Sequence, residues 1–536
     1  MKKSYILVGI IQVIFMALYY YFVLPPLNVQ AIAFWAFVVI SLVVFVSLLF
    51  IAYYGSEVIQ IKSRKKSKQE LPMIFIIPAI GIVAIIAIIL ILNIACSPLF
   101  NASSYAKRIT IDEAAVFTED FKEVDFRALP LLDRDSSEKL GDRVMGQMSE
   151  LVSQYYVSDQ YTQINYNDEI IRVTPLEYAD IIKWLSNRKD GVKGYIKVNS
   201  VTGESRLVKL DKGMKYMPSA YFNENLYRKL RFDYPTTTFG EVKFEIDNEG
   251  KPYWIATTYD YTAVGLKTKV SGVVILDPIT GDSKKYAMDK VPTWVDNAYN
   301  SELIIEQVDD WGNYNGGFWN SIFGQKNVVN TTDGYNYLAM NDDIYLYTGI
   351  TSVLADESNL GFIISNMRTG ETKMYSVAGA EEYSAMASAE GQVQQMKYKS
   401  TFPLLINLNN KPTYLVSLKD AAGLVKMYGF VDVEDYQKVV VSDASKGIEA
   451  AAQNYLNSYA DEISDDILIK KDIIVKRITS ATKAGNTIFY VTAEDNNKYT
   501  LSIELGDKLA FTSVGDKLSI GYYETKSEII EVVKLY

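Results

Sequence analysis

The Ser-x-x-Lys motif, in which a lysine can act as the base for a nucleophilic serine, is the only nucleophile–base pattern that we find in this sequence. The spacing occurs at Ser63–Lys66, Ser136–Lys139 and Ser480–Lys483. Serine enzymes that use this motif also carry Ser-Asp-Asn and Lys-Thr-Gly, and the chain contains neither tripeptide. We therefore interpret the three matches as chance.

Histidine is absent from all 536 residues, and Cys96 is the single cysteine. This composition excludes Ser/His/Asp and Cys/His catalysis, the usual zinc sites, His-ligated haem and an intrachain disulfide. Carboxylate-dependent hydrolysis, for example of cell-wall glycan, needs a defined pair of acids, and none can be assigned. The sequence therefore predicts a protein that is not an enzyme and binds no cofactor.

An aromatic stretch, "DDWGNYNGGFWNSIFGQKNVVN", begins at Asp309. Rigid aromatic anchors on a glycine-rich backbone are typical of binding loops. The candidate partner-binding residues are Trp311, Tyr314, Phe318, Trp319 and Phe323. The alternative is that these rings cover the core of their own module. Four oxygen ligands could gather Ca²⁺, although their spacing differs from an EF-hand. They are Asp309, Asp310, Asn313 and Asn315.

Three uncharged apolar stretches occupy the N-terminal region, at Tyr5–Leu24, Ala31–Tyr54 and Pro72–Cys96. Each exceeds or matches the roughly 20 residues that a helix needs to cross a bilayer. Cations precede the first stretch and fill the link between the second and third, at Lys2, Lys3, Lys62, Arg64, Lys65, Lys66 and Lys68. Because such segments stay in the cytoplasm, we predict a plasma-membrane protein with a cytoplasmic N-terminus and residues 98–536 extracytoplasmic.

Two other interpretations of this region are less well supported. A cleaved signal peptide would need a small-x-small site after the first stretch, and none is present. The letters "LNIAC" resemble a lipoprotein cleavage site with Cys96 as the lipidated residue, but Asn93 replaces the usual Leu and two apolar stretches precede it.

Net charge excludes one class of partner. Residues 98–536 hold 47 basic and 62 acidic side chains. This excess of acids disfavours DNA, RNA and other polyanions as ligands. We therefore expect the lipid bilayer and a protein or peptide, or a second copy of the chain, as partners.

One hairpin pattern recurs three times, starting at Gly194, Gly272 and Gly361. In each copy an Asn or Asp follows after five residues and Thr-Gly after eight, and an acid and a hydroxyl come next. An Asx side chain that caps a turn and a Gly with positive φ explain this spacing. Each copy continues into a helical stretch and another hairpin, and a partial fourth copy starts at Gly429.

Regrouped as helix, hairpin and Thr-Gly hairpin, residues 190–440 resemble PepSY and cystatin-like modules, and "VVILDPITGDSKKY" is the closest piece. The resemblance implies extracytoplasmic α+β modules that bind peptides or restrain peptidases. The stretch from "NVVNTTDGYNYLAMNDD" to "EEYSAMASAEGQVQ" also resembles large uncharacterised membrane proteins of anaerobic Gram-positive bacteria, some labelled colicin V production.

The two ends of the region are less regular. "TPLEYADIIKWLSNR" predicts a helix with Thr174 as its cap and Pro175 at its first position. After the helical link "SKGIEAAAQNYLNSYADEI" come five short strands, which resemble an OB-like or SH3-like small barrel. From Asp465 onward 10 basic and 11 acidic residues are balanced, so this barrel lacks the basic face that nucleic acid requires.

Together these patterns predict an α+β protein with three N-terminal transmembrane helices, an extracytoplasmic array of modules and a C-terminal small β-barrel. The expected divisions are 1–97 (anchor), 98–190 (divergent module), 191–270, 271–358 and 359–445 (repeat modules), and 446–536 (helical linker and barrel). The leading functional hypothesis is a non-enzymatic envelope protein that binds protein or peptide partners or self-assembles. A peptidase-regulating or sensory protein and a carboxylate-dependent cell-wall enzyme are the alternatives.

Overall fold

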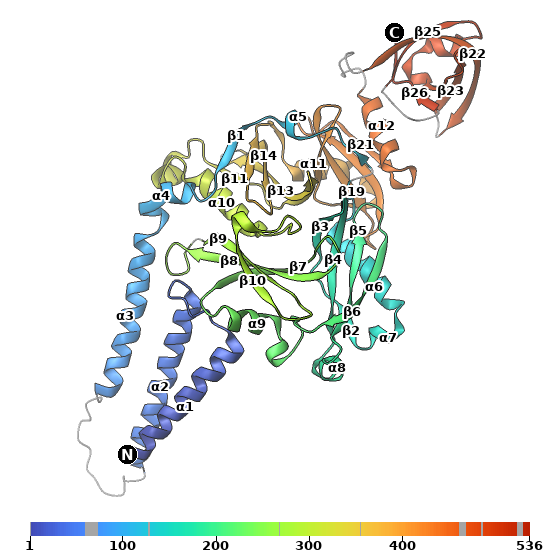
Figure 1. The fold of residues 1–536 in the computed structure, drawn as a ribbon. Helices are drawn as coiled ribbons and strands as arrows, with labels where there is room; N and C mark the ends of the chain where they lie inside the picture. Colours follow the sequence, from blue (N-terminus) through green and yellow to red (C-terminus); the bar gives the residue numbers. More distant parts are fainter. Residues whose placement is uncertain are drawn as a thin grey trace.

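Three long helices form the N-terminal part of the computed structural model (Figure 1). The model describes residues 2–58, 73–126, 129–266, 268–353, 355–459, 468–483, 486–522 and 529–536. The helices are α1 (Lys2–Val23), α2 (Ile32–Val58) and α3 (Met73–Ala95). All three are long and apolar enough to cross a membrane, which confirms the expected spans. The basic segment at 62–68 lies outside the described residues, so the orientation stays a prediction.

The chain next crosses the globular region (residues 98–536) as an extended segment. It consists of α4 (Pro98–Ala106), β1 (Ile111–Ala115) and α5 (Phe117–Asp120), and it runs on to residue 126. We call residues 111–126 the strap. β1 pairs in parallel with β15 (Thr372–Tyr375), and the Val124 N–H donates to the Asn407 carbonyl at 3.0 Å. The strap therefore joins two sheets that lie far from it in sequence.

Four α+β units follow, each a helix and then an antiparallel meander. The first comprises α6 (Arg134–Gly146), α7 (Ser149–Val152), β2 (Tyr155–Val157), β3 (Thr162–Tyr166), β4 (Glu169–Tyr178), α8 (Ile181–Asn187), β5 (Val192–Asn199) and β6 (Ser205–Met214). The second comprises η2 (Phe222–Glu224), α9 (Leu226–Asp233), β7 (Thr238–Ile246), β8 (Pro252–Tyr261), β9 (Thr268–Leu276), β10 (Ser283–Ala287) and η3 (Met288–Lys290).

The third unit comprises α10 (Ser301–Tyr314), η4 (Asn320–Gly324), β11 (Val329–Thr331), β12 (Asn336–Met340), β13 (Asp343–Ser352), β14 (Ala355–Asn366) and β15. The linker strand β16 (Gly379–Ala380) pairs with β14 of this unit. The fourth unit comprises α11 (Glu382–Gln392), η5 (Gln394–Met396), β17 (Lys399–Ser400), β18 (Leu404–Leu408), β19 (Lys411–Lys419), β20 (Val425–Asp432), β21 (Val439–Asp443) and η6 (Ala444–Lys446). The first three sheets thus combine the plain hairpin with the following Thr-Gly hairpin, and the fourth combines it with the partial copy that starts at Gly429. Residue 270 falls inside β9 and residue 358 inside β14, so the expected divisions at these points run through strands.

The three Thr-Gly turns share one geometry. Asn199, Asp277 and Asn366 each accept two backbone N–H groups of their own turn through Oδ1. The glycines that follow have φ between +75° and +80°, a conformation that only glycine adopts without strain. In the linker before each unit's helix, one residue also donates its N–H to a backbone carbonyl, that of the residue directly after the Asn or Asp that caps the turn. These bonds are Leu132 to Ser200 (3.1 Å), Tyr216 to Pro278 (3.0 Å), Tyr299 to Met367 (2.8 Å) and, in the fourth unit, Ala380 to Val433 (2.9 Å).

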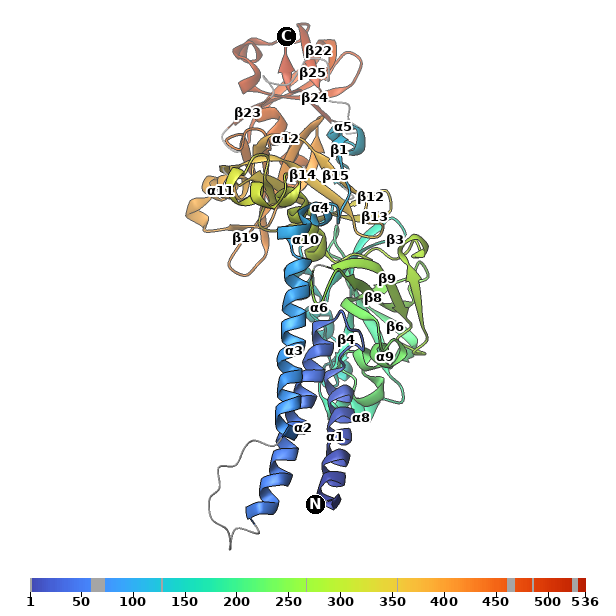
Figure 2. The ribbon, with the colours of Figure 1, turned by 90° about the vertical axis from the view of Figure 1, so that its left-hand side faces the viewer.

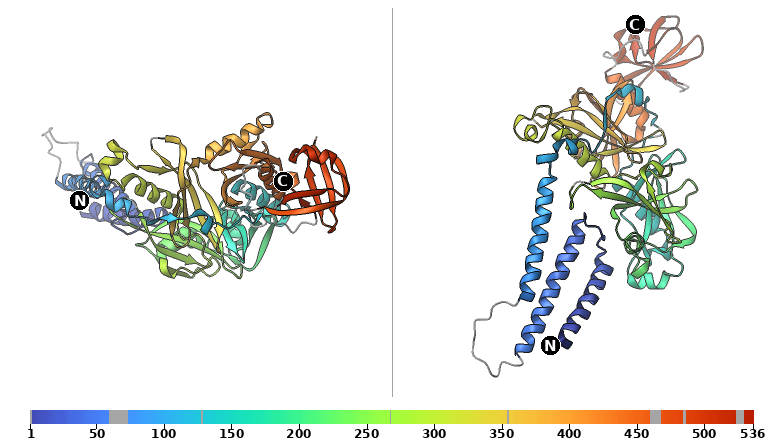
Figure 3. Two further views of the ribbon diagram at one scale, coloured as in Figure 1. Left: turned by 90° about the horizontal axis from the view of Figure 1, so that it is seen from above. Right: turned by 60° about the vertical axis from the view of Figure 1, so that its left-hand side comes forward.

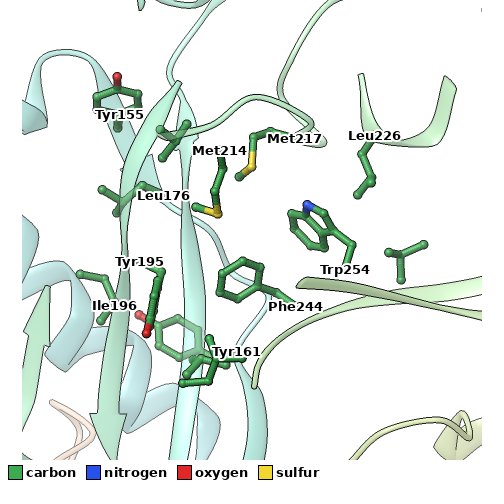
Figure 4. Packing of buried hydrophobic residues seen from close by; sticks show 14 of the residues in the cluster. Tyr155, Tyr161, Leu176, Tyr195, Ile196, Met214, Met217, Leu226, Phe244 and Trp254 are labelled. Atoms are coloured by element: carbon green, nitrogen blue, oxygen red, sulfur yellow. The ribbon is translucent and has the colours of Figure 1, made fainter. Parts of the chain in front are cut away.

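Hydrophobic cores pair the units. Figure 4 shows Tyr195 of the first sheet toward Phe244 of the second, with Ile196 on the opposite side of its strand and with Trp254 and Leu226 of α9 on the side of the second unit. A second core joins the third and fourth sheets and includes Phe117 and Phe121 of the strap. Strands such as β9 and β14 are buried on both faces, because further clusters cover their outer sides. The units therefore form one continuous body.

One expected helix is wrong in its N-terminal half. Thr174 and Pro175 lie in β4, which extends to Tyr178, and the helix α8 begins only at Ile181. Its N-cap is Asp180, which accepts the N–H groups of residues 182 and 183. Pairing of β4 with both β2 and β5 outweighs the Thr-Pro helix signal.

The C-terminal part is a small curved sheet with its own core. It follows α12 (Ile448–Ser458), and its strands are β22 (Ile469–Lys483), β23 (Asn486–Ala493), β24 (Lys498–Ser502), β25 (Lys517–Tyr522), β26 (Ile529–Glu531) and β27 (Lys534–Leu535). The long β22 pairs with β25 along its first part and with β23 along its second. This half-barrel agrees with the expected strand-dense tail. Figures 2 and 3 place it at the end of the molecule opposite to the N-terminus.

Candidate binding cleft

A polar cleft of about 1130 Å³ lies where the four units meet. Its walls come from all four sheets and from the N-terminal ends of α6 and α10. Volumes of this size are typical of sites for small molecules or short peptides. The lining carries six cationic side chains and five acidic ones. They are Arg134, Lys139, Arg172, Lys243, Lys399 and Lys419, and Asp133, Asp135, Glu241, Glu302 and Asp420.

The cleft walls coincide with an irregularity that all four units share. The first strand of each meander is a sheet edge, and it is interrupted. In units one, three and four the interruption separates two short strands, β2 from β3, β11 from β12 and β17 from β18; in unit two it is a bulge between Phe239 and Val242. Residues at or beside all four interruptions line the cleft. Interrupted edges leave backbone N–H and C=O groups outside the regular ladders. Some of these groups bond elsewhere: the Ser158 and Thr401 N–H groups donate to the carbonyls of Pro175 and Ser417, and the Phe402 carbonyl accepts from the Asn336 side chain.

Arg172 is the most informative side chain in the cleft. It lies on β4 opposite Gln163 of β3 and is only 7% exposed. Its Nε is buried without a hydrogen-bond partner, and the guanidinium has no ion pair with any of the described residues. Burial lowers the pKa of Arg172 to about 10, although the charges of Asp133 and Asp135 act to raise it. A buried cation without a direct ion pair is unfavourable, and such groups concentrate at functional sites.

The other cations of the cleft are better compensated. Lys419 of unit four pairs with Asp133, the N-cap of α6, and this pairing and the hydrogen bond from Ser136 hold the pKa of Asp133 low despite burial. Lys139 of α6 donates to the Ala422 carbonyl at 2.6 Å. These contacts join units one and four, so the cleft is closed on that side by direct contacts.

Lys243 projects from β7 with 3.6 Å between its Nζ and the Glu241 carboxylate. Burial acts against its charge, but Tyr337, Glu241 and Glu245 outweigh this effect and raise the pKa of Lys243. Arg172 is therefore the buried cation of this cleft that forms no ion pair with a described residue, although Asp133 and Asp135 are near enough to raise its pKa.

A buried network fixes the opposite side. The carboxylate of Glu245 accepts the backbone N–H groups of Asp296 and Asn297, both at 2.9 Å. Asp296 in turn accepts the Asn165 N–H at 2.6 Å. Burial raises the pKa of both acids, and for Asp296 the neighbouring Glu245 adds to the effect. Strand β3, strand β7 and the linker before α10 are thereby held together around the cleft.

The aromatic residues singled out in the sequence lie elsewhere and divide into two groups. Trp311 packs in the core beneath α10, and Tyr314 meets Tyr105 of α4 edge-on at 6.1 Å between ring centroids. The remaining three form an exposed ladder at η4. Phe318 contacts Trp319 edge-on at 5.4 Å, and Trp319 stacks on Phe323 at 5.8 Å. Trp319 and Phe323 are 63% and 78% exposed.

Two further candidates can be placed. The oxygen ligands considered for Ca²⁺ make other contacts: Asp309 accepts from Thr331, Asp310 pairs with Arg108, and Asn313 donates to Asn330. Ser136 and Lys139 both lie on α6, where Lys139 contacts Ala422. Ser63–Lys66 lies outside the described residues.

Sequence reasoning missed Arg172, although a signal was present. Its strand reads "EIIRVTPLEY", in which apolar residues flank the Arg on both faces. An apolar run without alternation indicates a strand buried on both sides, so any charge within it is buried.

Comparison with known proteins adds no argument on fold or function. No family model and no curated protein matches the chain. One of the solved structures detected, cobalt-substituted Synechocystis ACO, is 10% identical with a TM-score of 0.13 and covers 54% of this chain. A chimera of ACO and RPE65 is 8% identical with a TM-score of 0.14 and covers 70%. The chain spans 47% and 64% of these two structures.

Proposed function

We propose that this protein is a non-enzymatic, membrane-anchored protein of the cell envelope that binds a peptide or protein segment in the cleft between its units. Three apolar helices support the anchor. The N-terminus lies in the cytoplasm and residues 98–536 lie outside, as the flanking cations suggest.

The observation that carries the proposal is Arg172. A carboxylate of the ligand would form the direct ion pair that Arg172 lacks among the described residues, and Arg binds carboxylates through two parallel hydrogen bonds. Gln163, which lies opposite Arg172, also has a buried Nε2 without a partner and would donate to the same ligand. The preferred ligand is therefore acidic.

The interrupted edge strands favour a peptide over a compact metabolite. A peptide presents alternating N–H and C=O groups, and these can pair with the backbone of an edge strand. Four such edges surround the cleft. The tandem units are copies of one PepSY- or cystatin-like module, and the recurrent turn and linker hydrogen bonds support this interpretation.

Binding of acidic peptides by the full-length protein in nanodiscs tests the proposal. The probe is a mixture of random hexapeptides rich in Asp and Glu, compared with the same mixture carrying Asn and Gln. We expect saturable binding of the acidic mixture and at least a tenfold loss in Arg172→Gln, while Arg206→Gln, an exposed arginine outside the cleft lining, binds as the unaltered protein does. Equal binding of both mixtures, or an unaffected Arg172→Gln variant, would contradict the proposal.

The ladder of Phe318, Trp319 and Phe323 is a second candidate contact for a protein partner. Two adjacent rings exposed to this extent are unusual away from interaction sites. Crosslinking in cells and co-purification should recover a partner that the double variant Trp319→Ala/Phe323→Ala loses, while Arg172→Gln retains it. A partner retained by the double variant would exclude this surface.

A further inference from the structure

Apolar side chains gather on a surface beside the outer end of α1. The α8–η2 surface consists of Ile181, Ile182, Leu185, Tyr221, Phe222 and Phe232, and all six are exposed. Figures 1 and 2 show α8 level with the end of α1 that meets the globular region. The surface thus lies at the level where α1 ends.

Contacts between α9 and α1 fix this depth. Arg228 donates through Nε to the Tyr21 carbonyl at 2.9 Å and lies 4.1 Å from the centre of the Tyr21 ring. Arg231 donates to the Leu24 carbonyl at 2.9 Å. The Tyr21 carbonyl lies in the last turn of α1, where carbonyls have no helical N–H partner, and Leu24 directly follows the helix. Phe232 stacks on Tyr20 at 5.9 Å. One member of the surface therefore already packs on a membrane helix.

The rest of the surface is rigidly joined to this junction. Trp184 of α8 is buried, donates to Glu224 of η2 at 2.9 Å and packs against Phe222 at 5.7 Å. Arg188 pairs with the same Glu224 at 3.1 Å. The β8–β9 turn supplies a second fixed point, because Gly265 N–H donates to Gln30 at the start of α2. The α8–η2 surface therefore keeps its height above the membrane helices.

We propose that the α8–η2 surface inserts its apolar side chains into the headgroup boundary of the leaflet next to the globular region. The arrangement has the features of interfacial segments. Aromatic rings lie at the level of the end of α1, and apolar side chains on a short helix are bordered by Lys183 and Lys189, which can extend toward lipid phosphates. The contact fixes how the cleft is oriented relative to the membrane, and it does not depend on what the cleft binds.

Single-cysteine labelling tests this contact directly, because Cys96→Ser leaves the chain without thiols. In that background Ile182→Cys and Phe222→Cys receive an environment-sensitive NBD label, and the full chain is reconstituted in vesicles that contain phosphatidylcholine with a nitroxide near the headgroup. The matched control is Phe511→Cys, which is 83% exposed in the C-terminal half-barrel.

We expect blue-shifted emission and at least twofold quenching by the nitroxide lipid at residues 182 and 222, with neither effect at residue 511. Quenching at residue 182 by aqueous iodide to the same extent as at residue 511 would overturn the proposal. Protection from iodide without quenching by the lipid would also overturn it, because another protein surface would then be the occupant. Since the substituted side chains are exposed, the variants should fold.

Discussion

Replacement of Arg172 by Met should stabilise the protein. Burial lowers the Arg172 pKa from 12.5 to about 10. The guanidinium stays charged at pH 7 in both folded and unfolded states, so the lowered pKa is a free-energy cost of folding. At roughly 1.4 kcal/mol per pKa unit, the cost is about 3 kcal/mol. Met fills a similar volume with a flexible side chain, and imperfect packing should offset about 1 kcal/mol. The expected net gain is about 2 kcal/mol.

Arg231 provides a control of equal burial, because it is also 7% exposed. Its guanidinium donates to four backbone carbonyls, those of Leu24, Tyr234, Pro235 and Thr237. Arg231→Met leaves these acceptors without their donor and should destabilise by about 2 kcal/mol or more.

The assay is thermal and guanidinium unfolding of the full-length protein in detergent at pH 7, followed by tryptophan fluorescence. Trp184 and Trp254 are both buried in the core that units one and two share, so the signal reports on the region around Arg172. A gain of 2 kcal/mol corresponds to a rise of about 4–8 °C in Tm. A loss of stability comparable to that of Arg231→Met would show that Arg172 is structural and would refute the reasoning that assigns it to a ligand.

Three further predictions concern the rest of the fold. Burial raises the pKa of Glu177 from 4.5 to about 7, so the buried carboxyl costs no stability below pH 4.5 and destabilises the fold as pH rises through 7. In urea titrations Glu177→Gln should therefore raise the free energy of unfolding by about 3 kcal/mol at pH 8 and by almost nothing at pH 4.5. A gain that does not vary with pH would contradict this. Gly203→Ala should lower the free energy of unfolding by about 1 kcal/mol, because alanine is strained at positive φ. Gly370→Ala should lower it by about 2–3 kcal/mol, because a Cβ at this position would also lie 2.4 Å from the Tyr299 ring. Equal losses in thermal unfolding would exclude a role for Tyr299. Asn407→Ala removes the side-chain donor to the Phe121 carbonyl, a hydrogen bond of 2.7 Å. Hydrogen exchange at residues 119–126 should then accelerate at least tenfold, while exchange in the half-barrel stays unchanged. Unaltered exchange at these residues would mean that the other contacts of the strap are enough to hold it in place.

Local signals in the sequence predicted the turns and the membrane helices well. The Asn/Asp-x-x-Thr-Gly spacing defines a turn by chemistry within five residues, and Asn199, Asp277 and Asn366 all act as expected. Apolar stretches of more than 20 residues similarly need no partner to be recognised. The helix prediction at Thr174 and Pro175 failed, because pairing of β4 with its neighbouring strands decides the conformation of these residues and outweighs their local preference.

The cleft could not be predicted, because its residues come from segments more than 280 positions apart. The Lys139 contact with Ala422 and the Asp133 pairing with Lys419 each join unit one to unit four. No local pattern in the sequence indicates which edge strands of the four sheets come together around the cleft. The aromatic insertion could be recognised from its composition. Composition could not predict which rings are buried, and in the structure Trp311 faces the core while Trp319 and Phe323 face outward.

Hydrogen exchange across the cleft tests the central claim most directly. The full-length protein in nanodiscs is compared with and without the acidic hexapeptide mixture. We predict protection at all four interrupted edge strands, around residues 158–163, 239–243, 332–337 and 399–404, and no protection in Arg172→Gln. Unchanged exchange at these segments under saturating peptide, or protection that persists in Arg172→Gln, would contradict the assignment of the cleft as the binding site.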